Sequence, residues 1–277
     1  MEFNWNTMKT LYDTGILKDR LDCKNYISTF FIPTTSATHV LMENGKPTIV
    51  QKDIMTDVYL NRFEDDIKTW YKKKTIPKKL ICDISKPQLG DNFINISPQI
   101  KHKYQEYKLF SKQTRETVNV MLAYIKLIWA DSDDAVFTYL LKWFANVIKG
   151  VKNSSCLYAK GDEGIGKSTL PDFFVQYVIG KELFCKGKAD HLKGQHNLEL
   201  LGKILVVFEE LQCFSDKEWK AIDSEIKDLI TDSTASYTDK YERRFCADNN
   251  NNYIVNTNFN AIKGANGRRY LVCDINP

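Results

Sequence analysis

The 277-residue sequence lacks the features that mark secreted, zinc-binding and membrane-spanning proteins. Its seven cysteines are scattered singly without a C-x-x-C pair, and its four histidines do not stand beside cysteines at zinc-site spacing. No basic-then-apolar leader opens the chain, and no run of eighteen apolar residues occurs. We therefore expect free thiols, a reducing intracellular compartment and no membrane partner.

The chain also lacks a large excess of charge of either sign. The 39 lysines and arginines nearly balance the 35 aspartates and glutamates, which leaves a net charge of +4. A weakly basic chain is compatible with a nucleic-acid partner but does not require one. With 43% hydrophobic residues the chain can build a substantial core, and its length suits one large domain or two ordinary ones.

One glycine-rich stretch fits the phosphate-binding pattern G-x-x-x-x-G-K-[ST]. It consists of Gly161, Asp162, Glu163, Gly164, Ile165, Gly166, Lys167, Ser168 and Thr169. Its glycines let successive backbone N–H groups converge on a phosphate, and the following helix presents its positive end to the same group. We expect Lys167 to reach the β- and γ-phosphates of a nucleotide and Ser168 to ligate Mg²⁺. On the motif alone, a glycine-rich turn with a solvated lysine is the alternative.

The residues around this loop predict the strand and the helix that a phosphate loop requires. Residues 157–159 form a short apolar run, and residues 169–179 predict a helix that ends at Gly180. Pro171 lies near the start of that helix, where proline is tolerated but can also kink the chain.

A second apolar run, residues 203–210, ends in two acids. A continuous apolar run is typical of a parallel strand buried on both faces, and ligands in such sheets bind at the carboxyl ends of the strands. Glu209 takes the place of the metal-side carboxylate, which is usually aspartate, and we expect Glu210 to polarise the attacking water. Ordinary surface acids are the alternative.

Two further sites follow along the chain. The apolar run 253–255 leads to Asn258, which we expect to hydrogen-bond the γ-phosphate or the attacking water, with a turn-forming asparagine as the alternative. Arg268 and Arg269 then open a strand over 270–273. An arginine here can neutralise charge on the γ-phosphate of a neighbouring subunit's ATP, whereas a salt-bridged strand end is the competing interpretation.

The remaining sequence predicts mainly packing elements. We expect a strand over 27–32, a hairpin over 39–50, an amphipathic helix over 53–74, a connector over 86–98, and helices over 116–130 and from Asp133 or Asp134 to 148. Trp129, Trp143 and Phe144 are interpreted as core residues rather than base-stacking ones. The lysines at 72–74 and 78–79 suit a solvated helix end better than a phosphate contact, and the polar run 248–252 reads as a loop before a strand.

The order of these motifs resembles the superfamily 3 helicases, specifically the poxvirus-type primase-helicase C-terminal region. Residues 139–146 look like that family's helix leading into the phosphate loop, and residues 195–203 like its approach to the acidic strand. The resemblance covers residues 112–277. It implies an α/β fold, with a P-loop AAA+-like core whose central parallel sheet is flanked by helices, preceded by a mixed, largely helical N-terminal region. Residues 1–110 would form a collar or adaptor, and 111–277 a helical lead-in with the ATPase domain.

The resemblance further implies an ATP- and Mg²⁺-dependent replicative DNA helicase of viral or mobile-element origin, acting in host cytoplasm or nucleus. Such proteins form ring-shaped motors, usually hexamers, that translocate on single-stranded DNA, or RNA, and work with replication proteins. Residues 236–244 correspond to the hairpin that reaches the central channel. Lys240 matches the family's basic DNA contact and Tyr241 suits base stacking, although an ordinary exposed hairpin explains Tyr241 equally well. By the same pattern Arg269, which precedes the aromatic Tyr270, is the charge-neutralising arginine.

Two other functions remain open from the sequence. A DNA-binding AAA+ loader or assembly ATPase would bind DNA and ATP without separating a duplex. A P-loop small-molecule kinase would transfer phosphate to an acceptor and would not respond to DNA. The predicted roles of Asn258 and of the pair Arg268 and Arg269 argue against a kinase.

Overall fold

The computed structural model describes two compact units of the chain. The described residues are 30–35, 38–43, 46–51, 76–85, 90–98, 100, 105–192, 196–209, 216–238, 244–258 and 267–275, with a few single residues and short pieces between 10 and 25. Unit 1 comprises Met1–Ile81 and Gln88–Ile96, and unit 2 comprises Cys82–Pro87 and Ser97–Pro277. The expectation of a collar over residues 1–110 remains a prediction.

Unit 1 is described mainly as strands. β1 (Phe31–Pro33), β2 (Thr38–Glu43) and β3 (Lys46–Gln51) form an antiparallel sheet in that order, while β4 (Lys79–Ile81) pairs in parallel with β5 (Phe93–Asn95). The pairing of β2 with β3 confirms the predicted hairpin. The strand predicted over 27–32 is found later, at β1. The predicted helix over 53–74 and Lys72–Lys74 lie outside the described residues, and a largely helical N-terminal region is not shown.

Two capped helices lead into the nucleotide-loop region of unit 2. α5 (Lys112–Tyr124) follows the short helix η3 (Tyr107–Leu109) and begins where the Ser111 hydroxyl accepts the Thr114 N–H at 3.1 Å. It continues as the π-helical turn η4 (Ile125–Trp129). α6 (Asp134–Ile148) begins at the Asp133 carboxylate, which accepts two backbone N–H groups, and is followed by Gly150 at φ 70°. Both predicted helices are therefore confirmed, the first starting four residues earlier.

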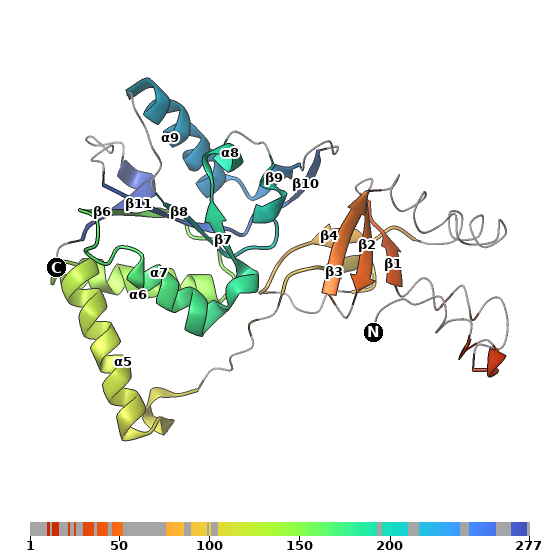
Figure 1. Ribbon diagram of the computed structural model, residues 1–277, viewed down its shortest axis with the longest axis horizontal. Helices are drawn as coiled ribbons and strands as arrows, with labels where there is room; N and C mark the ends of the chain where they lie inside the picture. Colours follow the sequence, from red (N-terminus) through yellow and green to blue (C-terminus); the bar gives the residue numbers. More distant parts are fainter. Residues whose placement is uncertain are drawn as a thin grey trace. The chain divides into compact units, whose positions relative to one another are not determined.

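A five-stranded parallel sheet forms the centre of unit 2 (Figure 1). Its strands are β12 (Tyr270–Asp274), β6 (Cys156–Lys160), β11 (Asn252–Thr257), β8 (Leu205–Glu209) and β7 (Phe184–Gly187), in that spatial order. The apolar runs that start at residues 157, 203, 253 and 270 predicted four of these strands. These are β6, β8, β11 and β12, and they are confirmed. The strand that carries the phosphate loop, β6, therefore lies inside the sheet between β12 and β11.

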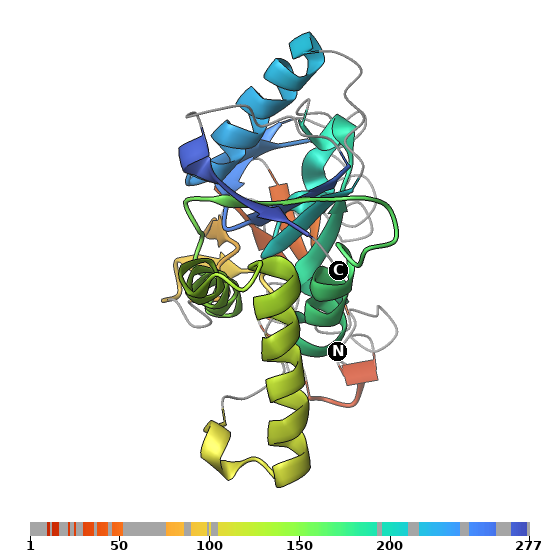
Figure 2. The ribbon, with the colours of Figure 1, turned by 90° about the vertical axis from the view of Figure 1, so that its left-hand side faces the viewer.

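Helices cover both faces of this sheet (Figures 1 and 2). α6 and α7 (Thr169–Phe174) lie on one face, and α7 continues through the π-helical turn η5 (Val175–Ile179) to Gly180 at φ 86°. α9 (Asp216–Thr231) lies on the other face. The remaining short elements are η6 (Lys181–Leu183), α8 (Ala189–Leu192), η7 (Asn197–Leu200), β9 (Thr234–Tyr237), β10 (Phe245–Asp248), which pairs with β9, and η8 (Gly267–Arg269). None of the helices in the described ranges is long and apolar enough to cross a membrane.

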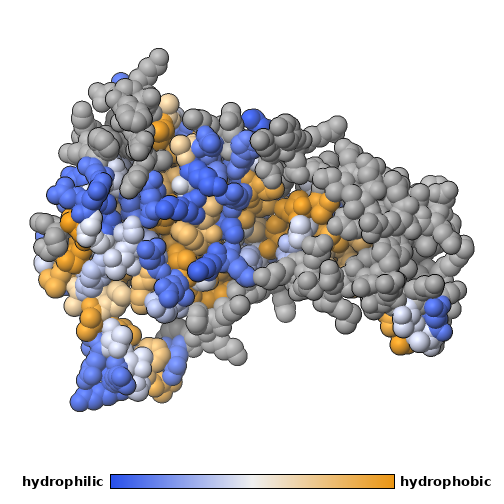
Figure 3. All heavy atoms as spheres, viewed as in Figure 1, coloured by the Kyte–Doolittle hydropathy of each residue, from blue (hydrophilic) through white to orange (hydrophobic). Residues whose placement is uncertain are grey.

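The core confirms the packing roles predicted for the large aromatic side chains. Trp129 and Trp143 are each 1% exposed and belong to the hydrophobic cluster between the helices and the sheet. Phe144 joins that cluster and its ring lies 4.7 Å from the ring of Phe174. Hydrophilic residues occupy much of the described face of unit 2 seen in Figure 3.

The asparagine run before β11, expected to be a polar loop, is largely buried. Asn249, Asn251 and Asn252 are 1–2% exposed, and their side-chain amides donate hydrogen bonds to backbone carbonyls from distant parts of unit 2. The Asn252 Oδ1 accepts both the backbone N–H and the side-chain amide of Asn153, at 2.7 and 2.8 Å, and its Nδ2 donates to the carbonyls of Val151 and Ile204. The run therefore joins several segments of unit 2 through buried hydrogen bonds, and we call it the asparagine hub.

We expect Asn252→Ala to lower the free energy of unfolding by about 3 kcal/mol, because it leaves several buried donors and acceptors unsatisfied. Asn250→Ala is the matched control: Asn250 is half-buried and its amide donates to the Cys82 carbonyl at 2.7 Å. That variant should lose only about 1 kcal/mol. Urea unfolding followed by circular dichroism measures both changes, and equal losses would contradict the hub.

Candidate active site

The phosphate loop connects the end of β6 to the start of α7. Gly164 and Gly166 have φ angles of 79° and 97°, a region that side-chain-bearing residues rarely adopt. A Cβ on Gly161 would lie 2.7 Å from the Ile275 carbonyl oxygen, so this position also requires glycine. The predicted strand, loop and helix are thus present, with α7 beginning at Thr169 as predicted.

Lys167 and Asn258 come together although they lie 91 residues apart in the sequence. The Lys167 Nζ donates to Asn258 Oδ1 at 2.8 Å and to the Gly161 carbonyl at 2.7 Å, and it also contacts the Asp162 carbonyl. The Asn258 amide in turn lies 3.4 Å from the Glu163 carboxylate. The two side chains predicted to contact a γ-phosphate, Lys167 and Asn258, are therefore in direct contact.

Ser168 and Glu209 also meet as the sequence suggested. The Ser168 hydroxyl donates to Glu209 Oε1 at 3.1 Å. Asn256 stands opposite Glu209 in the pairing of β11 with β8, and its Nδ2 lies 3.4 Å from the Ser168 hydroxyl. The Asn256 Oδ1 is buried and has no hydrogen-bond partner among the described residues.

These groups line a cavity of about 450 Å³ at the carboxyl edge of the sheet. Its lining residues are Glu163, Gly164, Gly166, Lys167, Ser168, Thr169, Asp172, Glu209, Asn256 and Asn258. The lining side chains are mostly polar and include one ammonium, two amides, and the oxygens of hydroxyl and carboxylate groups. A cavity of this size and chemistry suits a phosphorylated ligand.

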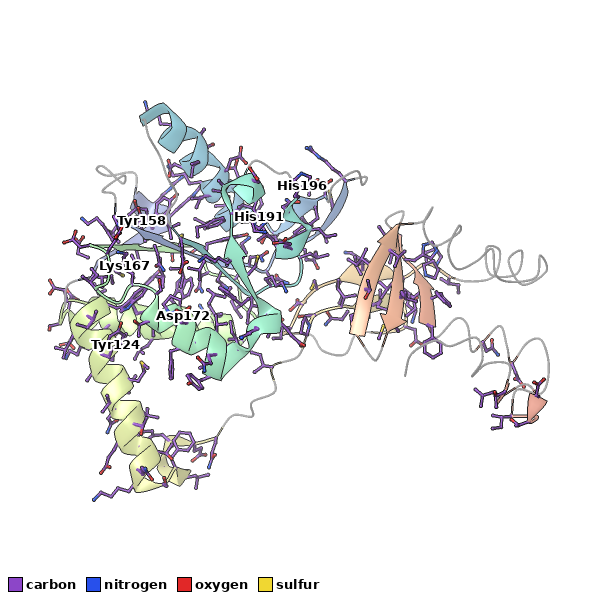
Figure 4. The ribbon with its side chains drawn as sticks, viewed as in Figure 1. Tyr124, Tyr158, Lys167, Asp172, His191 and His196 are labelled. Atoms are coloured by element: carbon purple, nitrogen blue, oxygen red, sulfur yellow. The ribbon has the colours of Figure 1, made fainter. Side chains whose placement is uncertain are left out.

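The helix α5 contributes to the loop from outside the sheet. Tyr124, near its carboxyl end, donates its hydroxyl to the Gly166 carbonyl at 3.1 Å. Figure 4 shows Tyr124, Lys167 and Asp172 at the same end of unit 2. The Tyr124 contact was not predicted, because nothing local in the sequence distinguishes a tyrosine that contacts a loop 42 residues away from one that packs in the core.

Asn256 was also missed as a site residue. Asn256 and Asn258 are two positions apart, and side chains alternate along a strand, so both point to the same side. This periodicity is the signal that could have identified Asn256 from the sequence.

The arginine pair lies away from this cavity. Arg268 and Arg269 belong to η8, a turn of 3₁₀-helix that directly precedes β12, and β12 begins at Tyr270 as predicted. Tyr270 pairs with Cys156 at the amino end of β6, whereas the phosphate loop follows Lys160 at its carboxyl end. Four strand residues separate those two levels, a distance of about 13 Å.

The first residue of β12 is hydrogen-bonded to α9, the helix on the face of the sheet away from α6 and α7. The Tyr270 hydroxyl donates to Asp223 of α9 at 2.8 Å, and burial raises the pKa of this tyrosine. Asp223 also forms an ion pair with Lys227 of the same helix. The arginine pair therefore directly precedes an anchored residue at the amino edge of the sheet.

Three predicted site residues lie outside the described residues. Glu210 directly follows β8, and Lys240 and Tyr241 fall between β9 and β10. Their roles remain predictions.

The residues present fit a hydrated magnesium ion. Mg²⁺ prefers oxygen ligands and keeps several of its waters. The Ser168 hydroxyl and the Glu209 carboxylate offer oxygens next to each other, and the unpartnered Asn256 Oδ1 can accept a hydrogen bond from a metal-bound water. The site therefore has the donor chemistry that the sequence predicts.

Comparison with known proteins adds information on the fold. Residues 159–269 match a family described as a family of unknown function (DUF5906). No curated protein matches the sequence. The apo structure of the NrS-1 C-terminal region (305-718) is similar, with a TM-score of 0.63 and 19% identity over 91% of this chain and 61% of that one.

Two A-form apo structures of the same NrS-1 region agree. Their TM-scores are 0.62 and 0.63 at 18% identity, and they cover 92% and 91% of this chain and 60% of their own chains. At such identity the likeness shows the fold alone. The chain spans about three fifths of the length of these structures.

Proposed function

We propose that this chain is an ATP-hydrolysing motor of the superfamily 3 helicase type that moves on single-stranded DNA as a ring, a hexamer by the family pattern. The observation that carries the proposal is the convergence of Lys167, Ser168, Glu209 and Asn258 on one cavity at the carboxyl edge of a parallel sheet. Four groups contributed by three separate segments, each suited to a triphosphate or its metal, argue for chemistry rather than for nucleotide binding alone.

The proposed reaction is in-line attack of water on the γ-phosphate. Bound magnesium would neutralise charge on the phosphate oxygens. Lys167 would exchange its contacts with the loop carbonyls and Asn258 for contacts with phosphate oxygens, and Asn258 would then be free to orient the γ-phosphate or the water. Glu210 is assigned to polarise that water, and Lys240 and Tyr241 to contact the DNA.

The location of Arg268 and Arg269 supports a site shared between subunits. Because both lie at the opposite end of β12 from the cavity's edge, they are poorly placed for their own cavity. A neighbouring copy in a ring can present them to this cavity, where their charge would stabilise the transition state.

The test is the ATPase rate with and without single-stranded DNA, measured together with the mass of the particle by light scattering. We expect hydrolysis that DNA stimulates and a mass that is a multiple of the monomer. A monomer whose hydrolysis ignores DNA would contradict the motor, and phosphate transfer to a small acceptor would instead indicate a kinase. Hydrolysis and DNA binding without separation of a forked duplex would favour a loader.

A further inference from the structure

Lys186 lies beside the candidate metal ligand and has no part in the proposed reaction. It belongs to β7, the edge strand, which pairs in parallel with β8 so that Lys186 stands opposite Val207 and Gly187 opposite Phe208. This register brings the lysine next to the end of β8, where its Nζ forms an ion pair with Glu209 Oε2.

The two oxygens of the Glu209 carboxylate therefore face different partners. Oε1 accepts the hydroxyl of Ser168 at 3.1 Å, and Oε2 pairs with the Lys186 ammonium. The Glu209 side chain is 26% exposed, so its charge is only partly screened by water, while that of Lys186 is 67% exposed. The carboxylate expected to meet a divalent cation is thus already neutralised by a monovalent one.

The Lys186–Glu209 ion pair affects how readily the site can bind a magnesium ion. A magnesium ion bound at Ser168 and Glu209 would bring two positive charges close to the ammonium of Lys186, and like charges at this range repel. Loading the metal therefore requires either that Lys186 move away or that both cations share one carboxylate. Either route lowers the affinity of the site for the metal.

We propose that Lys186 is the counter-ion of Glu209 in the metal-free site and that it sets the Mg²⁺ concentration at which the site loads. The inference rests on the proposed function, because it takes the cavity to be a metal–nucleotide site. It gives Lys186 a role in positioning Glu209, without contact to the reacting atoms.

The chain offers a closely matched control two residues away. Lys188 is similarly exposed, at 61%, and its Nζ pairs with Glu199 at 3.0 Å instead of with Glu209. Glu199 also faces the His191 Nε2 at 3.6 Å, and burial lowers the pKa of that histidine. Removing Lys188 therefore changes the charge of the same segment by the same amount without touching the metal ligand.

The experiment measures Mn²⁺ binding by electron paramagnetic resonance in the presence of a non-hydrolysable ATP analogue. We expect Lys186→Met to lower the dissociation constant for Mn²⁺ by about three- to tenfold, a range set by one partly screened unit charge near the ion. Lys186→Arg, which keeps the charge, and Lys188→Met should both remain near wild type. The gain in Lys186→Met should shrink at high salt, because screening weakens a partly exposed charge.

The outcomes separate the inference from the function. If Lys186→Met binds Mn²⁺ as wild type does or more weakly, or if Lys188→Met gains as much, the counter-ion role is wrong while the ATPase can stand. If wild type takes up neither Mn²⁺ nor the analogue, the proposed function and this inference both fall.

Discussion

Lys167→Ala is expected to abolish ATP hydrolysis while the protein stays folded. In the structure the Lys167 ammonium bridges the two ends of the site, from the Gly161 carbonyl to the Asn258 amide oxygen, so it can be offered to phosphate oxygens without a large backbone movement. Loss of one preorganised positive group at a transferring phosphoryl costs about 100- to 1,000-fold in rate. Turnover should therefore fall to the background of the assay.

The control for this variant is Lys126→Ala. Lys126 pairs with Asp134 at 2.8 Å on a partly exposed surface, and such pairs contribute little to stability. It should retain full ATPase activity, and both variants should unfold at temperatures close to that of wild type. Undiminished hydrolysis in Lys167→Ala would contradict the assignment of the phosphate loop.

Arg269→Ala is expected to be at least as damaging, and in a way that a second subunit can repair. An arginine supplied from a neighbour typically accelerates phosphoryl transfer by about 1,000-fold or more. Arg269 lies at the amino end of β12, and under the proposed function each subunit would offer this arginine to the next one in the ring. The variant alone should therefore bind ATP with normal affinity and hydrolyse it very slowly.

Mixing variants tests the shared site directly. Arg269→Ala keeps Lys167, and Lys167→Ala keeps Arg269, so an interface between the two inactive variants can hold one complete set of groups. We expect the mixture to recover part of the wild-type rate, with Arg268→Ala in place of Arg269→Ala showing which arginine is required. A fully active Arg269→Ala, or a co-assembled mixture without any recovery, would contradict catalysis across subunits.

Elements that depend on local sequence were predicted well. The strands β6, β8, β11 and β12 follow from apolar runs, and the start of α6 follows from Asp133, because a capping carboxylate and a buried strand are set by their nearest neighbours in the chain. The phosphate loop was identifiable for the same reason: its glycines and lysine occur within nine residues.

The sequence predicted that Lys167 and Asn258 serve one site, but several other contacts between distant segments were not predicted. Lys186 faces Glu209 only because β7 pairs with β8 in one particular register. The sequence of neither strand alone specifies that register. The asparagine run resembles a solvated loop in composition, and its burial comes from backbone groups up to about a hundred residues away. The prediction that Arg268 and Arg269 stand directly before a strand over 270–273 is confirmed, but the turn of 3₁₀-helix that they form there was not predicted.

The position of β12 beside β6 has a consequence for folding. The phosphate-loop strand gains one of its two neighbours only when residues 270–274 are available, more than a hundred residues after β6. Pairings of such long sequence separation form slowly, and until they form β6 has an unpaired edge that can associate with other chains. During synthesis the nucleotide loop would thus be among the last parts of unit 2 to be completed, since the Lys160–Asp274 ion pair and the Ile275 N–H bond to the Lys160 carbonyl both await β12.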